Sequence, residues 1–310
     1  MKKKIFIDGK AGTTGLRIEE RLSGRDDVEI ISLPDELRKN PEARREMLNK
    51  ADIVFLCLPD AAAIEAVSMI TNENTVVIDA STAHRTNPEW AYGFAELGPE
   101  FEEKIINSKR IAVPGCHASG FIALVYPLIK AGLLPKDALV TAHSITGYSG
   151  GGKAMIADYE ADAPSELLAA PRQYALTQSH KHIPEMVKIT GLESAPVFCP
   201  IVSSFYSGME VTVPLFKSQL IKGGIDEIRA VYKELYQSDI IYYSEGSDEG
   251  GFISAAKLSH KDSMQIEVYG NDERILLVAR YDNLGKGASG AAVECLNIKL
   301  GCKKTKTLEI

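Results

Sequence analysis

The first third of the 310-residue sequence alternates short apolar runs with segments of helical composition. The apolar runs occupy residues 4–8, 28–31, 52–58, 75–79 and 110–113, and the helical segments occupy 14–22, 42–49 and 61–70. Runs that are apolar along their whole length are typical of strands buried on both faces. A repeat of strand and helix in this order predicts a doubly wound α/β domain around a parallel sheet.

The pattern changes after about residue 115, where longer strand-like runs follow one another with few helices between them. These runs occupy residues 138–146, 195–203, 209–216, 264–269 and 274–281, and one strong helical pattern covers 225–236. They predict an α+β region with a mixed or antiparallel sheet. The length of the chain also favours two domains over one. Beyond Cys302 we expect a frayed basic tail.

Charge and composition exclude several classes of protein. The chain has 35 Lys and Arg against 42 Asp and Glu, which gives a net charge of -7 and argues against nucleic acid as a partner. The longest uncharged run, residues 111–129, is interrupted by Pro114, Gly115 and Pro127, so it predicts strand, turn and helix rather than a membrane span. The basic residues 2–4 precede too short an apolar stretch for an export signal.

The five cysteines are odd in number and include no C-x-x-C pair. This argues against a disulfide framework or a zinc site and favours a cytoplasmic location.

A glycine-rich turn follows the first predicted strand and leads into the first predicted helix. Its spacing is G-x-x-G-x-x-G, a variant of the dinucleotide-binding fingerprint, over Gly9, Gly12, Thr13, Thr14 and Gly15. Glycines in this position let the backbone approach a pyrophosphate at the positive end of a helix. A plain turn is the alternative, and the βαβ context favours cofactor binding over it.

The end of the second predicted strand bears on the choice between NAD and NADP. Sites that prefer NAD usually place an acid there to bind both ribose hydroxyls, whereas this strand ends in Ile31-Ser32-Leu33. Ser32 leaves room for a 2′-phosphate, with Arg17, Arg38 or Lys39 as candidate partners. Asp35 and Glu36 lie close by, so the sequence favours NADP only slightly.

Cys116 lies in the sharpest local motif, Val113-Pro114-Gly115-Cys116-His117, between the fifth predicted strand and an apolar helix. A thiol at a helix N-terminus gains thiolate character, which makes Cys116 a candidate nucleophile. A structural cysteine in a tight turn is the equal alternative. The other four cysteines are interpreted as structural.

A cysteine nucleophile in a nicotinamide enzyme needs a partner that moves protons, and histidine is the usual choice. His180 and His182 lie in His180-Lys181-His182-Ile183-Pro184-Glu185, a loop that enters a helix. Their spacing with Glu185 would also suit a metal, but no third group of ligands supports that interpretation.

Two further segments carry candidate ligand contacts. Residues 147–153 contain Ser149, three glycines and Lys153, and form either a flexible loop or an anion-binding turn. Ser81 and Arg85 follow the fourth predicted strand, at the carboxyl edge of the sheet where ligands bind. Arg85 is a candidate for gripping a carboxylate or phosphate, or for a surface ion pair.

Taken together, these segments resemble the N-acetyl-gamma-glutamyl-phosphate reductases, in their short form, over nearly the whole chain. Six segments match in order: residues 9–15, 81–85, 114–116, 149–153, 180–185 and 286–290. The family is part of a wider group that includes the aspartate-semialdehyde and glyceraldehyde-phosphate dehydrogenases.

The resemblance implies NADPH-dependent reduction of N-acetyl-L-glutamyl 5-phosphate to the 5-semialdehyde, a step of arginine biosynthesis. It implies Cys116 as the nucleophile, His180 as the acid/base, His182 as its neighbour and Gly287 as a cofactor contact. Ser149, Lys153, Arg85 and Arg172 are the remaining candidates for the substrate. It also implies an NADP-binding domain of residues 1–115 with 285–310, and a catalytic and oligomerisation domain of residues 116–284 that forms a homodimer or homotetramer.

The sequence departs from the long form of the family at His117 and Ala118, where that form has Tyr-Pro, and at Lys181, where it has Arg. An ammonium cannot hold an anion in a fork as a guanidinium does, so substrate contacts near Lys181 are open. The alternatives are an aspartate-semialdehyde dehydrogenase, an acetylaminoadipyl-phosphate reductase and an inactive NADP-binding regulator.

Overall fold

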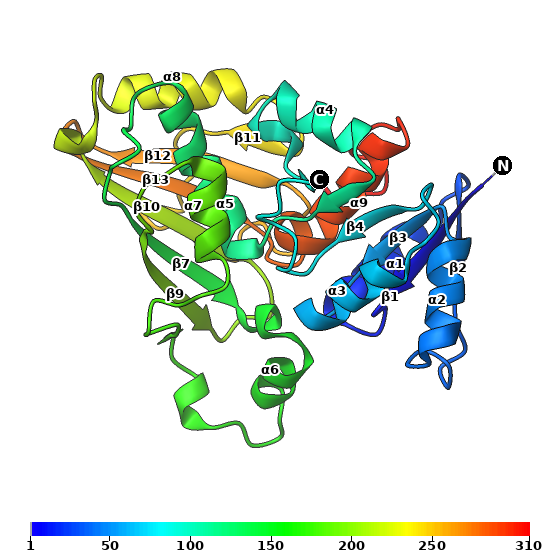
Figure 1. Cartoon of the computed structure of the whole chain (residues 1–310). Helices are drawn as coiled ribbons and strands as arrows, with labels where there is room; N and C mark the ends of the chain where they lie inside the picture. The colour runs from blue at the N-terminus through cyan, green and yellow to red at the C-terminus, as the bar shows by residue number, and fades with distance from the viewer. Residues whose placement is uncertain (1) are drawn as a thin grey trace. The chain divides into compact units, whose positions relative to one another are not determined.

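The computed structural model describes residues 2–310 and divides them into two compact units. The first contains the chain up to Ala95 together with Pro99–Pro114 and Ala288–Leu308. The second contains Glu96–Gly98, Gly115–Gly287 and Glu309–Ile310. Each unit has its own sheet (Figure 1).

The first unit is built on a six-stranded parallel sheet in the order β2-β1-β3-β4-β6-β5. Its strands are β1 (Lys3–Asp8), β2 (Val28–Ile31), β3 (Ile53–Leu56), β4 (Val76–Asp79), β5 (Ala91–Tyr92) and β6 (Arg110–Ala112). Its helices are α1 (Thr13–Leu22), α2 (Pro41–Lys50), α3 (Asp60–Met69), α4 (Pro99–Asn107) and α9 (Gly290–Lys299). The predicted doubly wound α/β domain is confirmed, with β5 as a short strand that the sequence pattern did not indicate.

Alternation along β1 explains why helices cover both faces of this sheet. Ile5 packs into one buried cluster with Ile18 of α1 and Val293 of α9. Phe6, which points to the opposite face, packs into a second cluster with Leu48 of α2. Both faces of the strand are therefore apolar, which is why the run reads as continuous hydrophobicity rather than as an alternating pattern.

The second unit is built on a seven-stranded mixed sheet in the order β11-β12-β13-β10-β7-β9-β8. Its strands are β7 (Thr141–Gly147), β8 (Arg172–Gln173), β9 (Val197–Ser203), β10 (Met209–Phe216), β11 (Ile241–Tyr243), β12 (Met264–Gly270) and β13 (Arg274–Tyr281). β7 pairs with β9 and β11 with β12 in parallel, and the other pairs are antiparallel. This confirms the predicted mixed sheet.

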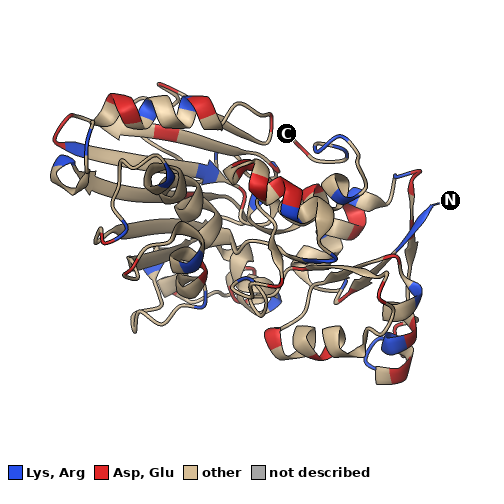
Figure 2. Ribbon diagram, turned by 45° about the horizontal axis from the view of Figure 1, so that its top comes forward, with Lys and Arg blue, Asp and Glu red and all other residues tan. Residues whose placement is uncertain are grey.

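Four α-helices accompany this sheet: α5 (Cys116–Lys130), α6 (Gly152–Tyr159), α7 (Ile183–Thr190) and α8 (Ile225–Leu235). α5 packs against β10 and β13, and α8 packs against β12. Tyr236 ties the region after α8 to α5 by donating to the carbonyl of Ala123 at 2.7 Å. In the view of Figure 2, acidic and basic residues are interspersed along α8, at Asp226, Glu227, Arg229, Lys233 and Glu234.

Short helical turns complete the chain: η1 (Ala95–Leu97), η2 (Tyr148–Gly151), η3 (Glu166–Leu168), η4 (Lys217–Gln219) and the π-turn η5 (Gly285–Ser289). The expectation of a frayed tail is wrong. The side-chain amide of Asn297 donates to the carbonyls of Lys304 and Lys306 at 2.8 Å each, and Glu309 N donates to Asp262 at 2.9 Å. Among residues 2–310, no helix is long and apolar enough to cross a membrane.

Candidate active site

The glycine-rich turn has the backbone that the spacing predicts. Gly9 follows β1 directly and has a φ of +86°, and a Cβ added there would lie 2.3 Å from the carbonyl oxygen of Cys57. Gly15, in the first turn of α1, would bring a Cβ to 2.6 Å from the Cα of Lys10. Both positions therefore require glycine. Gly12 caps α1, whose first two residues are Thr13 and Thr14.

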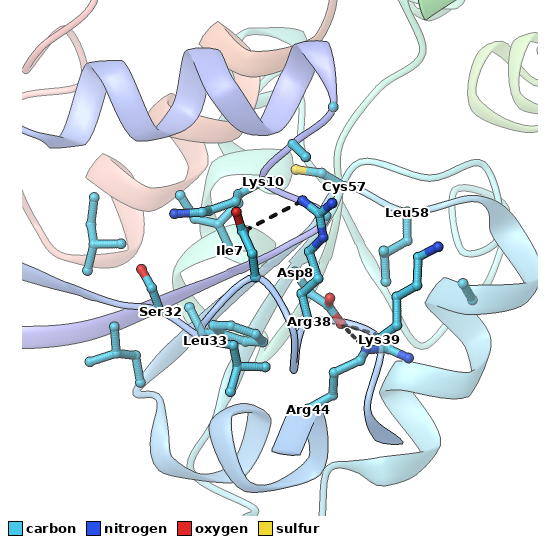
Figure 3. A pocket seen from close by; sticks show the side chains of 18 of the residues that line it. Ile7, Asp8, Lys10, Ser32, Leu33, Arg38, Lys39, Arg44, Cys57 and Leu58 are labelled. Carbon is cyan, nitrogen blue, oxygen red and sulfur yellow. Dashed lines mark hydrogen bonds and ion pairs between the residues drawn. The ribbon is translucent and has the colours of Figure 1, made fainter. Parts of the chain in front are cut away.

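A cavity of about 460 Å³ opens beside this turn and extends along the end of β2 (Figure 3). Gly9 and Gly12 line it with their backbones, and Ser32, Arg38 and Lys39 line it from the segment after β2. Arg38 forms an exposed ion pair with Asp35 at 3.7 Å, so the acid that weakened the NADP argument is partly neutralised. Arg17 is not among the lining residues.

A buried ion pair forms part of the wall of the same cavity. Arg44 of α2 donates to Asp8 from two nitrogens, at 2.9 and 3.2 Å (Figure 3). It also donates to Glu65 at 3.2 Å. Burial raises the pKa of Asp8, and the guanidinium of Arg44 offsets part of that rise. The pair places a fixed charged surface next to Gly9, which motif spacing did not reveal.

Ser81 and Arg85 lie on the segment that follows β4, and both are engaged within the protein. The buried hydroxyl of Ser81 donates to Asp79 at 2.7 Å, and His84 Nδ1 contacts the same carboxylate at 2.6 Å. Arg85 is buried and donates to the carbonyls of Val113 at 2.8 Å and Ala80 at 3.0 Å. These bonds tie Arg85 to the carboxyl edge of the sheet, and its role in binding an anion stays a prediction.

Cys116 is the first residue of α5, so the helix begins at the cysteine itself. The N–H of Gly115, the residue that caps α5, donates to the buried carboxylate of Glu185 at 2.8 Å. The hydroxyl of Tyr281 donates to the carbonyl of Cys116 at 2.6 Å and accepts from Gly120 N at 3.0 Å. Two side chains from distant segments therefore fix the first turn of α5 and the direction of its thiol.

Gly287 lies in the π-turn η5 of the second unit. A Cβ added to it would lie 3.0 Å from the Cβ of Cys116. The carboxylate of Asp282 shapes this turn by accepting from the backbone of Leu284 at 2.7 Å and Gly285 at 2.9 Å. Within the second unit, Gly287 thus keeps open the space beside the thiol.

Cys57 is the clearest contrast with Cys116. It follows β3, where burial and the neighbouring carboxylates of Asp79 and Asp8 raise the pKa of its thiol to about 12. All five cysteines are free. A thiol held in its protonated form is a poor nucleophile, in line with the structural interpretation of Cys57.

Three histidine rings lie together next to Cys116. The ring of His180 lies 4.7 Å from that of His182 and 5.7 Å from that of His117, measured between centroids. His180 is half-buried and accepts from the backbone N–H of His182 at Nδ1 over 3.2 Å. Burial, aided by Lys181, lowers the pKa of His180 to about 4, so the ring is neutral at physiological pH. His182 is buried and caps α7.

His117 and Tyr174 are the site residues that motif reasoning missed. His117 is buried, and its two ring nitrogens contact Ser144 Oγ at 2.7 Å and the Tyr174 hydroxyl at 2.6 Å. Burial, with the nearby His180 and Lys181, lowers the pKa of His117 to about 3. The position of His117 directly after Cys116 was the available signal, whereas Tyr174 and Ser144 are brought in only by the fold.

The remaining candidates for substrate contacts differ in what they offer. Ser149 is buried and accepts from the side-chain amide of Asn283 at 3.0 Å, so it belongs to the framework. Lys153 is exposed on α6. Arg172 of β8 is half-buried, lies over the ring of Tyr159 and donates to its hydroxyl at 3.1 Å. Tyr174 follows β8 directly, two residues after Arg172.

The chemistry of the site is that of a thiol with neutral proton carriers. In the part of the chain that the structure describes, no group of three or more His, Cys, Asp or Glu side chains is arranged to hold a metal ion. A nucleophilic thiol at a helix N-terminus beside a neutral imidazole is suited to acyl transfer through a thioester.

Comparison with known proteins gives two family matches that together cover most of the chain. Residues 9–105 match the model of the semialdehyde dehydrogenase NAD-binding domain, and residues 116–283 match that of the semialdehyde dehydrogenase dimerisation domain. An N-acetyl-gamma-glutamyl-phosphate reductase of Sinorhizobium medicae is 46% identical over 97% of this chain and 99% of its own. One of Brucella ovis is also 46% identical, over 97% of this chain and 100% of its own.

Solved structures show the same fold at much lower identity. An aspartate semialdehyde dehydrogenase II of Vibrio cholerae, complexed with ASA, superposes with a TM-score of 0.74 at 16% identity, over 97% of this chain and 99% of that one. An aspartate semialdehyde dehydrogenase of Candida albicans with NADP gives 0.66 at 15% identity, over 96% and 98%. At these identities the likeness concerns the fold alone.

Proposed function

The chain belongs to the N-acetyl-gamma-glutamyl-phosphate reductase family, and from this we propose that it reduces N-acetyl-L-glutamyl 5-phosphate to N-acetyl-L-glutamate 5-semialdehyde and phosphate, with NADPH, in arginine biosynthesis. The observation that carries the proposal is the relationship to these reductases over nearly the whole chain. The position of Cys116 at the start of α5, beside a neutral His180, supports the chemistry.

In the proposed mechanism the Cys116 thiolate attacks the acyl carbon of the substrate, the carbon–oxygen bond to phosphate breaks, and a thioester forms. NADPH, when bound, supplies the hydride that reduces the thioester. His180 is the proposed acid/base group at the substrate oxygen: its Nε2–H donates a hydrogen bond to the oxygen that becomes negative in the thiohemiacetal, and this oxygen re-forms the carbonyl as the carbon–sulfur bond breaks. The aldehyde leaves and the Cys116 thiolate is restored. The neighbouring His182 holds His180 by its backbone N–H.

The residues of the first unit fit a dinucleotide. We assign the pyrophosphate to the backbone of Gly9, Gly12 and the first turn of α1, because a Cβ at Gly9 would close this approach. Ser32, Arg38 and Lys39 line the cavity where a 2′-phosphate needs a small side chain and cations, and we assign the preference for NADP to them. Thr13, Thr14, Gly15 and Ser81 remain proposed contacts.

For the substrate's anionic groups we place Arg172 ahead of Lys153 and Arg85. Arg172 Nε is buried without a hydrogen-bond partner among residues 2–310, whereas Arg85 is committed to backbone carbonyls. An unpaired buried donor is costly, and a carboxylate or phosphate bound in its fork would satisfy it. His182 and Ser149 are proposed to support the pocket from its wall.

The match to a dimerisation domain supports an oligomer, and we propose a homodimer or homotetramer made through the second unit. Exposed apolar side chains, among them Leu139, Leu176 and Val197, are available there for burial between subunits. Five free thiols are suited to a reducing cytoplasm, which is the proposed location.

The test runs the reaction backwards. The initial rate of NADP⁺ reduction is measured with N-acetyl-L-glutamate 5-semialdehyde, with and without inorganic phosphate, and then with aspartate 4-semialdehyde and the homologue that is one methylene longer. We expect sustained turnover only with phosphate, and a preference of about 10-fold or more for the acetylglutamyl substrate. Equal rates on the three aldehydes would reject the assigned substrate.

A further inference from the structure

Ser144, His117 and Tyr174 form a chain of hydrogen bonds next to Cys116. The contacts of these residues determine which group donates in each bond. Ser144 lies in β7 with no exposed surface, and His117 Nδ1 is the single hydrogen-bond partner of its hydroxyl within residues 2–310. A buried hydroxyl proton without an acceptor costs free energy, so the Ser144 hydroxyl donates and Nδ1 accepts.

The tautomer of His117 follows from that assignment. The ring is neutral because burial lowers the pKa of His117 to about 3. A neutral imidazole whose Nδ1 accepts carries its proton on Nε2, so Nε2–H donates to the oxygen of Tyr174 over 2.6 Å. The hydroxyl proton of Tyr174 therefore does not point to His117.

Because the Tyr174 oxygen accepts from His117, the hydroxyl proton of Tyr174 is left to donate to another group. Within the described part of the chain, the Tyr174 hydroxyl has no second hydrogen-bond partner. Burial raises the pKa of Tyr174, so the hydroxyl stays protonated. The ring of Tyr174 lies 5.9 Å from that of His180 and 6.1 Å from that of His117, measured between centroids, which places it in the same cluster of rings. Because His117 follows Cys116 in the chain, the ring that orients this hydroxyl is fixed to the same turn of α5.

We propose that the Tyr174 hydroxyl, oriented by the Ser144–His117 pair, donates a hydrogen bond to the Cys116 thiolate and makes it the reactive form of the free enzyme. The proposal deepens the function proposed above, since it assigns the activation of the nucleophile. His180 is then left to handle the proton of the substrate oxygen. A hydrogen bond to a thiolate stabilises the charged form and lowers the thiol pKa.

Other titratable groups around Cys116 also act on its thiol. They are His117 on α5, Glu185 on α7, Tyr281 on β13, and Tyr174, His180, Lys181 and His182 on the segment before α7. The test must therefore remove the single hydroxyl and leave these groups in place. Tyr174→Phe does so. Tyr236→Phe is the matched control, because its buried hydroxyl donates to the carbonyl of Ala123 in the same helix.

The experiment measures the rate at which iodoacetamide alkylates the Cys116 peptide between pH 5 and 9, read by mass spectrometry. We expect Tyr174→Phe to raise the apparent pKa of Cys116 by about one unit and to slow alkylation at pH 7 about tenfold. Ser144→Ala should shift it in the same direction by less, since His117 can then accept from Tyr174. Tyr236→Phe should leave the profile unchanged.

An alkylation profile of Tyr174→Phe that matches the wild type would overturn the proposal, even if turnover fell. The measurement needs neither substrate nor NADP⁺, so its result does not depend on the acetylglutamyl assignment. If the wild type fails to oxidise N-acetyl-L-glutamate 5-semialdehyde while the Tyr174→Phe shift is observed, the function is wrong and the role of Tyr174 stands.

Discussion

The dinucleotide turn of the first unit and the thiol site of the second are built in opposite ways. The turn uses residues that are adjacent in sequence, and it works through backbone geometry: Gly9 and Gly15 leave no room for a Cβ. The thiol site draws side chains from widely separated segments, including Ser144, Tyr174 and Glu185. The dinucleotide turn can therefore be predicted from sequence spacing, whereas the thiol site depends on contacts that only the fold creates.

The largest difference between the two sites is expected from Cys116→Ala, which removes the proposed nucleophile and leaves the residues of the dinucleotide turn unchanged. Turnover should fall by more than about 10⁴-fold, because no thioester can form. The dissociation constant for NADPH, measured by fluorescence titration, should stay within about twofold of the wild type. Retained turnover would reject covalent catalysis, and lost NADPH binding would show that the two sites are not separable.

His180→Asn tests the proton carrier of the thiol site. We expect kcat/KM to fall about 10² to 10³-fold, since general acid–base catalysis contributes on that scale. The pKa of His180 is lowered to about 4, so the ring is neutral above that pH and becomes protonated below it. The loss of rate on approaching pH 4 should therefore flatten in the variant. His182→Asn is the comparison, and a larger loss there would move the role to His182.

Replacing Arg38 and Lys39 together by Ala tests the rim of the cofactor cavity. Removing two cations next to the proposed 2′-phosphate should weaken NADPH binding about tenfold and leave NADH binding unchanged. Isothermal titration with both nucleotides measures this. Lys50→Ala, on an exposed position of α2 that does not line the cavity, should change neither. Equal losses for NADPH and NADH would place the 2′-phosphate elsewhere.

The smallest expected effect is a pH dependence of the free energy of unfolding, which comes from the buried His117 of the thiol site. His117 has a folded pKa of about 3, below its ordinary value of 6.5, so the unfolded chain binds one more proton between these pH values. The free energy of unfolding should thus fall as the pH drops below 6.5, by about 1.4 kcal/mol per pH unit from this residue. Urea unfolding at pH 7, 6 and 5 should show a shallower slope in His117→Gln than in the wild type or in His143→Gln. An unchanged slope would mean that His117 is not buried as a neutral ring.

The same comparison explains what the sequence could predict. The strands and the glycine turn could be predicted because apolar runs and glycine spacing are local signals. Cys116 and His180 were proposed from short motifs, and their roles stay predictions. Tyr174 and Ser144 carry no motif, because they reach His117 only through the pairing of β7, β8 and β9. The contacts of Arg85 could not be predicted for the same reason: a basic residue after a strand does not reveal that it donates to the carbonyls of Val113 and Ala80.

The tail was also misjudged, since a basic composition suggested fraying while Asn297 and Asp262 bind its backbone. Local composition cannot show acceptors and donors supplied by distant segments.

The central claim is that Cys116 carries the acyl group, and a single-turnover experiment tests it most directly. The enzyme is mixed with N-acetyl-L-glutamate 5-semialdehyde and excess NADP⁺ without phosphate. After acid quenching and digestion, the mass of the Cys116 peptide is measured by mass spectrometry. We predict a burst of one NADPH per Cys116, then a stall, with one N-acetylglutamyl group on that peptide until phosphate is added. No adduct on Cys116, or an adduct on another cysteine, would contradict the claim.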